Sequence, residues 1–213
     1  MSVRRNRGGK SLKRKVGTRP VKRIIVAFCE GEGSEPDYIK GLQRLPEVAG
    51  NAALSIELSD RHGVPYTLVD NAVALKKTDP EVDECWCLFD VEWPQNHPRL
   101  SDAIGRADSV AGVYVAVSNP CFEVWLIMHH KNVTAFLTTD QAEQFSRAAD
   151  ERPGKHINAD LYMPKRGDAV RRAETLEQRH HSNGTVSPHD NPSSGVFRFL
   201  RAVGADPTTG RRY

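Results

Sequence analysis

Three short apolar runs, rich in β-branched and aromatic residues, mark the predicted interior strands of a sheet. They cover residues 23–29, 85–89 and 113–117. Runs of this length without polar alternation are typical of parallel strands that are buried on both faces. A fourth segment, residues 53–60, alternates apolar and polar residues, which predicts a strand with one exposed face near a sheet edge.

Segments with apolar residues at helical spacing separate and follow these strands. The first is predicted to begin with Ser34 as its N-cap and to end before Pro46. A second, residues 122–128, is apolar nearly all round, which predicts a buried helix capped by Asn119 with Pro120 in its first turn. Further helices are predicted at residues 65–77, 100–109, 140–149, 166–179 and 196–204.

The order of these elements predicts an α/β fold with three parts. Strands alternate with helices in residues 23–130, which predicts a core with a mainly parallel sheet. The pattern in residues 131–213 predicts helices and no strands. We interpret this part of the chain as a helical extension packed on the core. Residues 1–22 show neither pattern and form a basic arm.

Basic residues are concentrated in this arm. Residues 1–23 contain ten Lys or Arg and no acid, so the rest of the chain has 20 basic against 27 acidic residues, a net charge of −7. A basic arm on an acidic body is typical of proteins that contact nucleic acid, and a disordered solubilising tail is the alternative. The residues predicted to contact nucleic acid are Arg4, Arg5, Arg7, Lys10, Lys13, Arg14 and Lys15.

The remaining composition indicates the cellular setting. The chain has no run of 18 apolar residues, so no membrane-spanning helix is predicted, and its amino terminus lacks the apolar core of a signal peptide. We therefore expect a cytoplasmic protein without membrane contact. Its four cysteines all lie in apolar segments and are expected to be reduced thiols of the core: Cys29, Cys85, Cys87 and Cys121.

Acidic residues follow directly after two of the predicted interior strands. Glu30 and Glu32 follow the first strand in a glycine-rich turn, and Asp90 and Glu92 follow the second. Open α/β sheets bind ligands at the carboxyl ends of their strands, and Mg²⁺ prefers carboxylate oxygens. The sequence therefore predicts a shared site for Mg²⁺ or Mn²⁺. If the chain stays extended there, Asp90 and Glu92 point to the same side.

Two later residues could belong to the same site. Glu123 lies in the first turn of the buried helix, where it could interact favourably with the helix dipole or face the acidic cluster. Lys155 lies in a Pro-Gly loop from which it could reach a phosphate.

Three motifs in this order resemble the RloB family of prokaryotic TOPRIM-like proteins. They are Glu-Gly-Glu-x-x-Glu-Pro-x-Tyr after the first strand, Phe-Asp-x-acid at the second, and Ser-Asn-Pro-Cys-Phe-Glu-x-Trp after the third, which is the most specific. The resemblance covers about residues 23–204. It implies a TOPRIM core, a Rossmannoid sheet in which a glutamate after the first strand and an Asp-x-Asp after a later strand bind Mg²⁺.

The resemblance also implies roles for residues at matching positions. The first-strand glutamate would be Glu30 or Glu32, with Glu30 preferred, and the paired acids would be Asp90 and Glu92. Glu92 replaces the usual aspartate, and its longer side chain shifts the ion by about one methylene. The implied catalytic residues are Glu30, Asp90, Glu92 and Lys155, and the implied metal ligands are Glu30, Glu32, Asp90, Glu92 and Glu123.

The predicted function is a Mg²⁺- or Mn²⁺-dependent nuclease that hydrolyses DNA or RNA. The resemblance implies a role in a prokaryotic anti-phage defence system, together with an ATPase partner. The alternative is a non-catalytic module of such a system that binds nucleic acid or the ATPase. The sequence leaves the oligomeric state open.

Overall fold

The computed structural model describes residues 22–209, which form a five-stranded sheet in the order β2-β1-β3-β4-β5. The first four strands pair in parallel, and β5 is antiparallel to β4. This sheet confirms the predicted α/β, Rossmannoid class of fold. The strands are β1 (Arg23–Cys29), β2 (Leu54–Leu58), β3 (Val82–Asp90), β4 (Val113–Asn119) and β5 (Ser193–Ser194).

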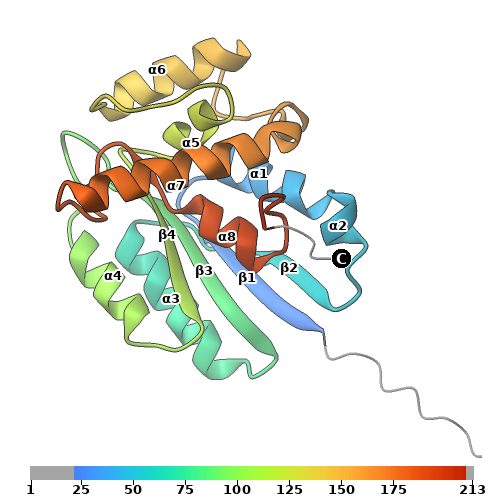
Figure 1. Ribbon diagram of the computed structural model, residues 1–213. Helices are drawn as coiled ribbons and strands as arrows, with labels where there is room; N and C mark the ends of the chain where they lie inside the picture. Colours follow the sequence, from blue (N-terminus) through green and yellow to red (C-terminus); the bar gives the residue numbers. More distant parts are fainter. Residues whose placement is uncertain (1–21, 210–213) are drawn as a thin grey trace, which may run out of the picture.

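Helices cover both faces of the sheet (Figure 1). One face is covered by α3 (Pro65–Thr78) and α4 (Leu100–Asp108). The other is covered by α1 (Ser34–Gln43), α5 (Glu123–Met128), α7 (Arg166–Ser182) and α8 (Val196–Ala202). The remaining helices are α2 (Pro46–Ala49), α6 (Thr139–Asp150), η1 (Ala159–Leu161) and η2 (Met163–Lys165). Helix α6 packs against α5, beyond the end of the sheet.

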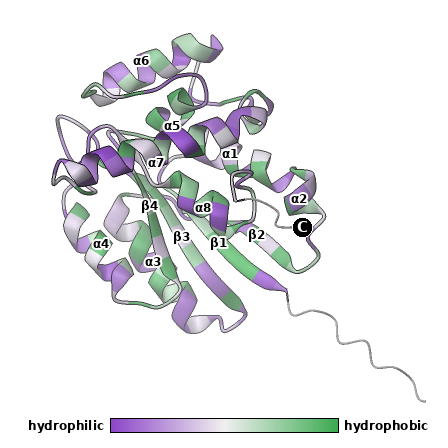
Figure 2. Cartoon of the chain, viewed as in Figure 1, coloured by the Kyte–Doolittle hydropathy of each residue, from purple (hydrophilic) through white to green (hydrophobic). Residues whose placement is uncertain are grey.

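The strand β1 shows why both faces need this cover. Ile25 and Ala27 belong to the hydrophobic cluster on the α1 side, and Val26 and Phe28 belong to the cluster on the α3 side. Side chains alternate between the two faces of a strand, so a continuous apolar run supplies both clusters at once. In Figure 2 the interior strands are accordingly mostly hydrophobic, while the helices carry many of the hydrophilic positions.

The carboxyl-terminal part differs from its prediction in one element. Ser193 and Ser194 form β5 against Asn119 and Ser118 of β4, so the expectation of helices without strands after residue 131 was wrong. The pairing is short and non-local, and no alternation in the sequence indicates it. The hydrophobic cluster on the α1 side contains residues from both sides of position 131, from Ile25 to Ala205.

Two predicted helix caps were also wrong. Ser34 is the first residue of α1 and makes no capping hydrogen bond, and Asn119 is the last residue of β4. The Asn119 amide donates instead to the carbonyl oxygen of Pro188, at 2.8 Å. In both cases acceptors that are distant in the sequence replace the backbone partners of a cap, so local sequence could not indicate them.

The prediction for the cysteines agrees with the structure. All four cysteines are buried and form no disulfide, and burial raises the pKa of Cys29 and Cys87. They are free thiols buried in the fold, as predicted. Among residues 22–209, no helix combines the length and apolar character that crossing a membrane requires.

Candidate functional site

The carboxyl ends of β1, β3 and β4 surround a cavity of about 230 Å³ that α6 and the segment after it complete. Every residue to which the sequence assigned a catalytic or metal-binding role lies on its wall. Seven acidic side chains and three basic side chains line it: Glu30, Glu32, Glu35, Asp90, Glu92, Glu123 and Glu143, with Arg147, Arg152 and Lys155. The cavity lining is therefore predominantly acidic.

Glu30 links the ends of the two central strands. It follows β1, and its Oε2 accepts a hydrogen bond from the backbone N–H of Asp90 at 3.1 Å. Its Oε1 lies 2.6 Å from Nε2 of His97. This close contact raises the pKa of His97, because the carboxylate stabilises the imidazolium. Glu32, by contrast, is exposed at the rim of the cavity.

Glu92 reaches the cavity by a route that differs from the prediction. The strand β3 ends at Asp90, and Glu92 has a positive φ of 65°, so the chain is no longer extended there. The prediction that strand alternation aligns the two acids was therefore wrong, although both line the cavity. The Glu92 carboxylate accepts a hydrogen bond from the Thr139 hydroxyl at 2.7 Å, which ties it to the start of α6.

Glu123 is held at the cavity by residues from both neighbouring segments. The Ser34 hydroxyl lies 3.0 Å from Oε1 of Glu123 and 3.0 Å from the backbone oxygen of Lys155. Gly33 permits this close approach, because a Cβ there would lie 3.0 Å from Cβ of Lys155. The first turn of α1 thus packs directly against the loop that carries Lys155, and the exposed Lys155 side chain remains at the cavity wall.

Arg152 is a cavity residue that the sequence analysis missed. Its side chain is only 6% exposed, and its Nη1 donates to both oxygens of Asp150 at 3.0 Å. Its Nη2 lies 3.6 Å from Oε1 of Glu123. This buried guanidinium positions Glu123 and offsets part of the negative charge. No pattern marks it, since it reaches the site only through the packing of the segment after α6.

Glu35 is the second residue that was missed. It lies in the first turn of α1, is 8% exposed and lines the cavity. Burial, followed by the repulsion of Glu123 and Glu30, raises its pKa to about 7. The signal was present in the sequence, because Glu35 is the third glutamate of the motif after the first strand, three residues after Glu32.

Asp90 is at the centre of the acidic cluster. Burial raises its pKa well above the usual range, and Glu35, Glu123, Glu30 and Glu92 all contribute repulsion in the same direction. A carboxyl group with four acidic neighbours loses a proton only at a high electrostatic cost. The site therefore favours either protons or an added cation between its carboxylates.

The donor atoms fit a hard divalent cation in their chemistry, because they are carboxylate oxygens crowded by like charge. In residues 22–209, however, no three acidic, histidine or cysteine side chains are arranged to hold a metal ion. The carboxylates of Glu30, Glu92 and Glu123 engage protein donors instead. Coordination would require these side chains to exchange protein hydrogen bonds for the ion.

The residues predicted to contact nucleic acid, at positions 4–15, lie outside the described part of the chain. Their role stays a prediction.

Comparison with known proteins places the chain in a family. The family model described as RloB-like protein matches residues 25–203, most of the chain and all three acidic strand ends. The chain belongs to the RloB-like family. This RloB-like assignment confirms the resemblance seen in the motifs. No curated protein and no solved structure matched the chain in the same comparisons.

Proposed function

We propose that the chain is a divalent-metal-dependent nuclease that hydrolyses phosphodiester bonds in DNA or RNA. The observation that carries this proposal is the crowding of Glu30, Glu35, Asp90 and Glu123 at the carboxyl ends of parallel strands, where burial, followed by mutual repulsion, raises the pKa of Glu35 and Asp90. Carboxylates crowded in this way are stabilised by a cation between them, and Mg²⁺ and Mn²⁺ prefer oxygen ligands.

Glu30 and Asp90 are the proposed main ligands, with Glu32, Glu35, Glu92 and Glu123 as further oxygen donors. A bound Mg²⁺ or Mn²⁺ supplies polarisation of the phosphate and a lowered pKa of the attacking water. The protein itself positions these groups. Arg152 holds Glu123, Thr139 holds Glu92, and the exposed ammonium of Lys155 supplies a positive charge for a phosphate oxygen.

The proposed setting is an anti-phage defence system in which an ATPase partner controls the nuclease. This part of the proposal rests on the resemblance of the motifs to TOPRIM-like proteins.

A second candidate function is a non-catalytic module that binds nucleic acid or the ATPase. It is favoured by one observation, namely that Glu30, Glu92 and Glu123 already have protein hydrogen-bond partners. In that case the carboxylates would serve as structural links between β1, β3, α1 and α6.

The experiment compares the protein with its Asp90→Asn variant on plasmid DNA and on RNA, with Mg²⁺ or Mn²⁺. We expect metal-dependent cleavage that falls by about 10- to 100-fold or more in the variant. Asp168→Asn is the matched control, because Asp168 lies on α7 in an exposed ion pair with Arg171. Cleavage by Asp90→Asn at the full rate would contradict the proposal.

Calorimetric titration with Mn²⁺ separates the two candidate functions when the protein alone does not cleave. A nuclease that is active only with its partner still binds Mn²⁺, and the Asp90→Asn variant does not bind it. Such a nuclease cleaves nucleic acid once the ATPase and ATP are added. A structural module binds no metal at this cavity, and that result would exclude the nuclease.

A further inference from the structure

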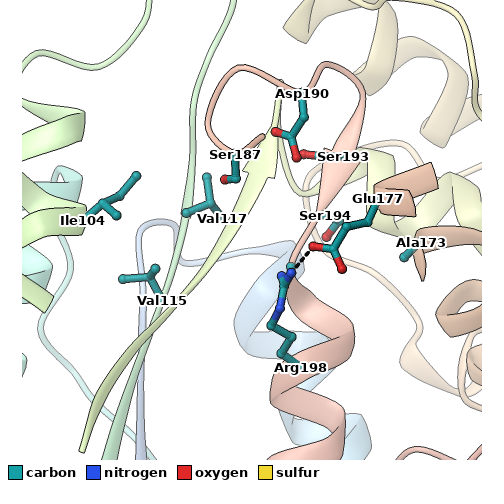
Figure 3. A pocket seen from close by; sticks show the side chains of 11 residues that line it. Ile104, Val115, Val117, Ala173, Glu177, Ser187, Asp190, Ser193, Ser194 and Arg198 are labelled. Carbon is teal, nitrogen blue, oxygen red and sulfur yellow. Dashed lines mark hydrogen bonds and ion pairs between the residues drawn. The ribbon is translucent and has the colours of Figure 1, made fainter. Parts of the chain in front are cut away.

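A second cavity lies beside β4 and β5, away from the acidic cavity, with which it shares no lining residue. It has a volume of about 250 Å³. Figure 3 shows its apolar side, formed by Ile104 of α4 and by Val115 and Val117 of β4. The opposite side is polar and comes from the segment that enters β5 and from the helices α7 and α8. The cavity is thus apolar on one wall and polar on the other.

Asp190 is the unusual residue of this cavity. It is only 5% exposed, yet its Oδ1 has no hydrogen-bond partner among the described residues, and it lies on the cavity wall (Figure 3). An ionised carboxylate only accepts hydrogen bonds, and burying one without a donor is costly. Such a group requires a hydrogen-bond donor, and residues 22–209 supply none to Oδ1.

The missing partner is not explained by a loosely held segment. The residues on both sides of Asp190 are fixed by hydrogen bonds to other parts of the fold. Asn119 donates to the Pro188 carbonyl at 2.8 Å, and Nε2 of His180 donates to the Pro192 carbonyl at 2.9 Å. The backbone therefore holds the carboxylate in place at the cavity.

The other charged groups of the cavity leave Asp190 uncompensated. Glu177 and Arg198 form an ion pair with each other (Figure 3). The Ser194 hydroxyl bonds to that of Ser118 at 3.1 Å. The cavity thus offers one free carboxylate, further serine hydroxyls and an apolar wall, which suits a flat ligand with hydrogen-bond donors along one edge.

We propose that this cavity binds a small planar group with two adjacent N–H donors, which the Asp190 carboxylate accepts as a pair. A guanine base and a guanidinium group share this chemistry. Both present their donors in the plane of a flat group whose faces pack on Ile104, Val115 and Val117. This site is independent of the proposed nuclease activity.

Binding is tested by calorimetry with the intact protein in EDTA, so that the metal site plays no part. Guanosine is compared with inosine, which lacks only the 2-amino group, and methylguanidine represents the guanidinium source. We expect guanosine to bind roughly ten-fold or more tightly than inosine, because the second hydrogen bond is to a charged acceptor. Asp190→Asn should abolish this binding, and Asp168→Asn should leave it unchanged. Binding of methylguanidine alone, lost on Asp190→Asn, would support the guanidinium source.

Thermal unfolding of the same variants without ligand supplies a second measurement. Because Asp190→Asn removes an unpaired buried carboxylate, we expect its unfolding midpoint to equal or exceed that of the unmodified protein. If this variant does not fold, the ratio of guanosine to inosine affinity in the unmodified protein is the measurement that tests the proposal. The proposal is overturned if no probe binds at millimolar concentration, if guanosine and inosine bind equally and methylguanidine does not bind, or if binding survives Asp190→Asn.

Discussion

The carboxyl group of Glu35 is buried beside Glu30 and Glu123, and this placement raises its pKa from 4.5 to about 7. The folded protein therefore binds the Glu35 proton more tightly than the unfolded chain does. The contribution of this group to stability is complete below pH 4.5 and is lost as the pH rises to about 7. At pH 8 the ionised side chain opposes folding.

Glu35→Gln removes this charge and keeps the shape of the side chain. In EDTA at pH 8 we expect the variant to be more stable than the unmodified protein by roughly 1–3 kcal/mol. The difference should shrink as the pH falls toward 4.5, where Glu35 is protonated. Urea unfolding at several pH values measures it.

The exposed neighbour Glu32 supplies the control for this measurement. Glu32→Gln removes a carboxylate from the same cavity, but from its rim, so we expect a change within about 0.5 kcal/mol. A Glu35→Gln protein that is less stable at pH 8, or that keeps the pH dependence of the unmodified protein, would show that Glu35 is not repelled by its neighbours.

Among the elements, β1 to β4 and most helices could be predicted, including the first residues of α3, α4, α7 and α8, but the helix caps could not. The apolar runs that become β1, β3 and β4 are encoded by continuous local patterns, and their carboxyl ends share one edge in any parallel sheet. This is why the sequence alone could predict that Glu30 and Asp90 lie close together. Ser34 escaped prediction because its hydroxyl bonds to Glu123 and Lys155, far along the chain.

The start of α1 gives a prediction about this packing. A Cβ at Gly33 would lie 3.0 Å from Cβ of Lys155 and 3.2 Å from its backbone oxygen, so Gly33→Ala must displace the Lys155 loop. We expect a loss of about 1–3 kcal/mol in the free energy of unfolding, together with slower cleavage if Lys155 contacts the phosphate.

Gly154→Ala is the control, because no atom lies within 4 Å of a Cβ at Gly154, one residue before Lys155. Urea unfolding and the cleavage assay are applied to both variants. Equal stability of Gly33→Ala and Gly154→Ala would mean that the Lys155 loop can shift without cost. The contact between Gly33 and Lys155 would then not position Lys155.

At the scale of the whole molecule, the sequence predicted most of the acidic residues of the site and Lys155, but neither Glu35 nor the buried Arg152. Most of the acidic residues follow the carboxyl ends of β1, β3 and β4, and these ends lie side by side at one edge of the sheet. Arg152 and Thr139 come from the segment that α6 brings over the edge of the sheet, and β5 comes from a still later crossover. Contacts between such distant segments depend on how the helices pack against one another. The spacing of hydrophobic residues along the sequence does not indicate this packing.

The distribution of charge over the whole chain leads to the last prediction. Residues 1–21 hold eight of the 30 Lys and Arg residues, and residues 22–213 have 22 basic against 27 acidic residues, a net charge of −5. The acidic body repels phosphates, so nucleic-acid binding should depend on the arm. If about half of the eight basic residues in positions 1–21 meet phosphates, removing residues 1–21 lowers the logarithmic salt slope of binding by roughly 4.

Fluorescence anisotropy with labelled DNA and RNA at increasing salt concentration measures this slope. A full-length variant with Gln at Arg4, Arg5, Arg7, Lys10, Lys13, Arg14 and Lys15 separates charge from chain length, and it should behave like the truncated protein. Mn²⁺ titration of both variants should match the unmodified protein, because the acidic cavity lies in the body of the fold. An unchanged salt slope after truncation would move the nucleic-acid contact from the arm to the body, where Lys155 and Arg147 line the acidic cavity.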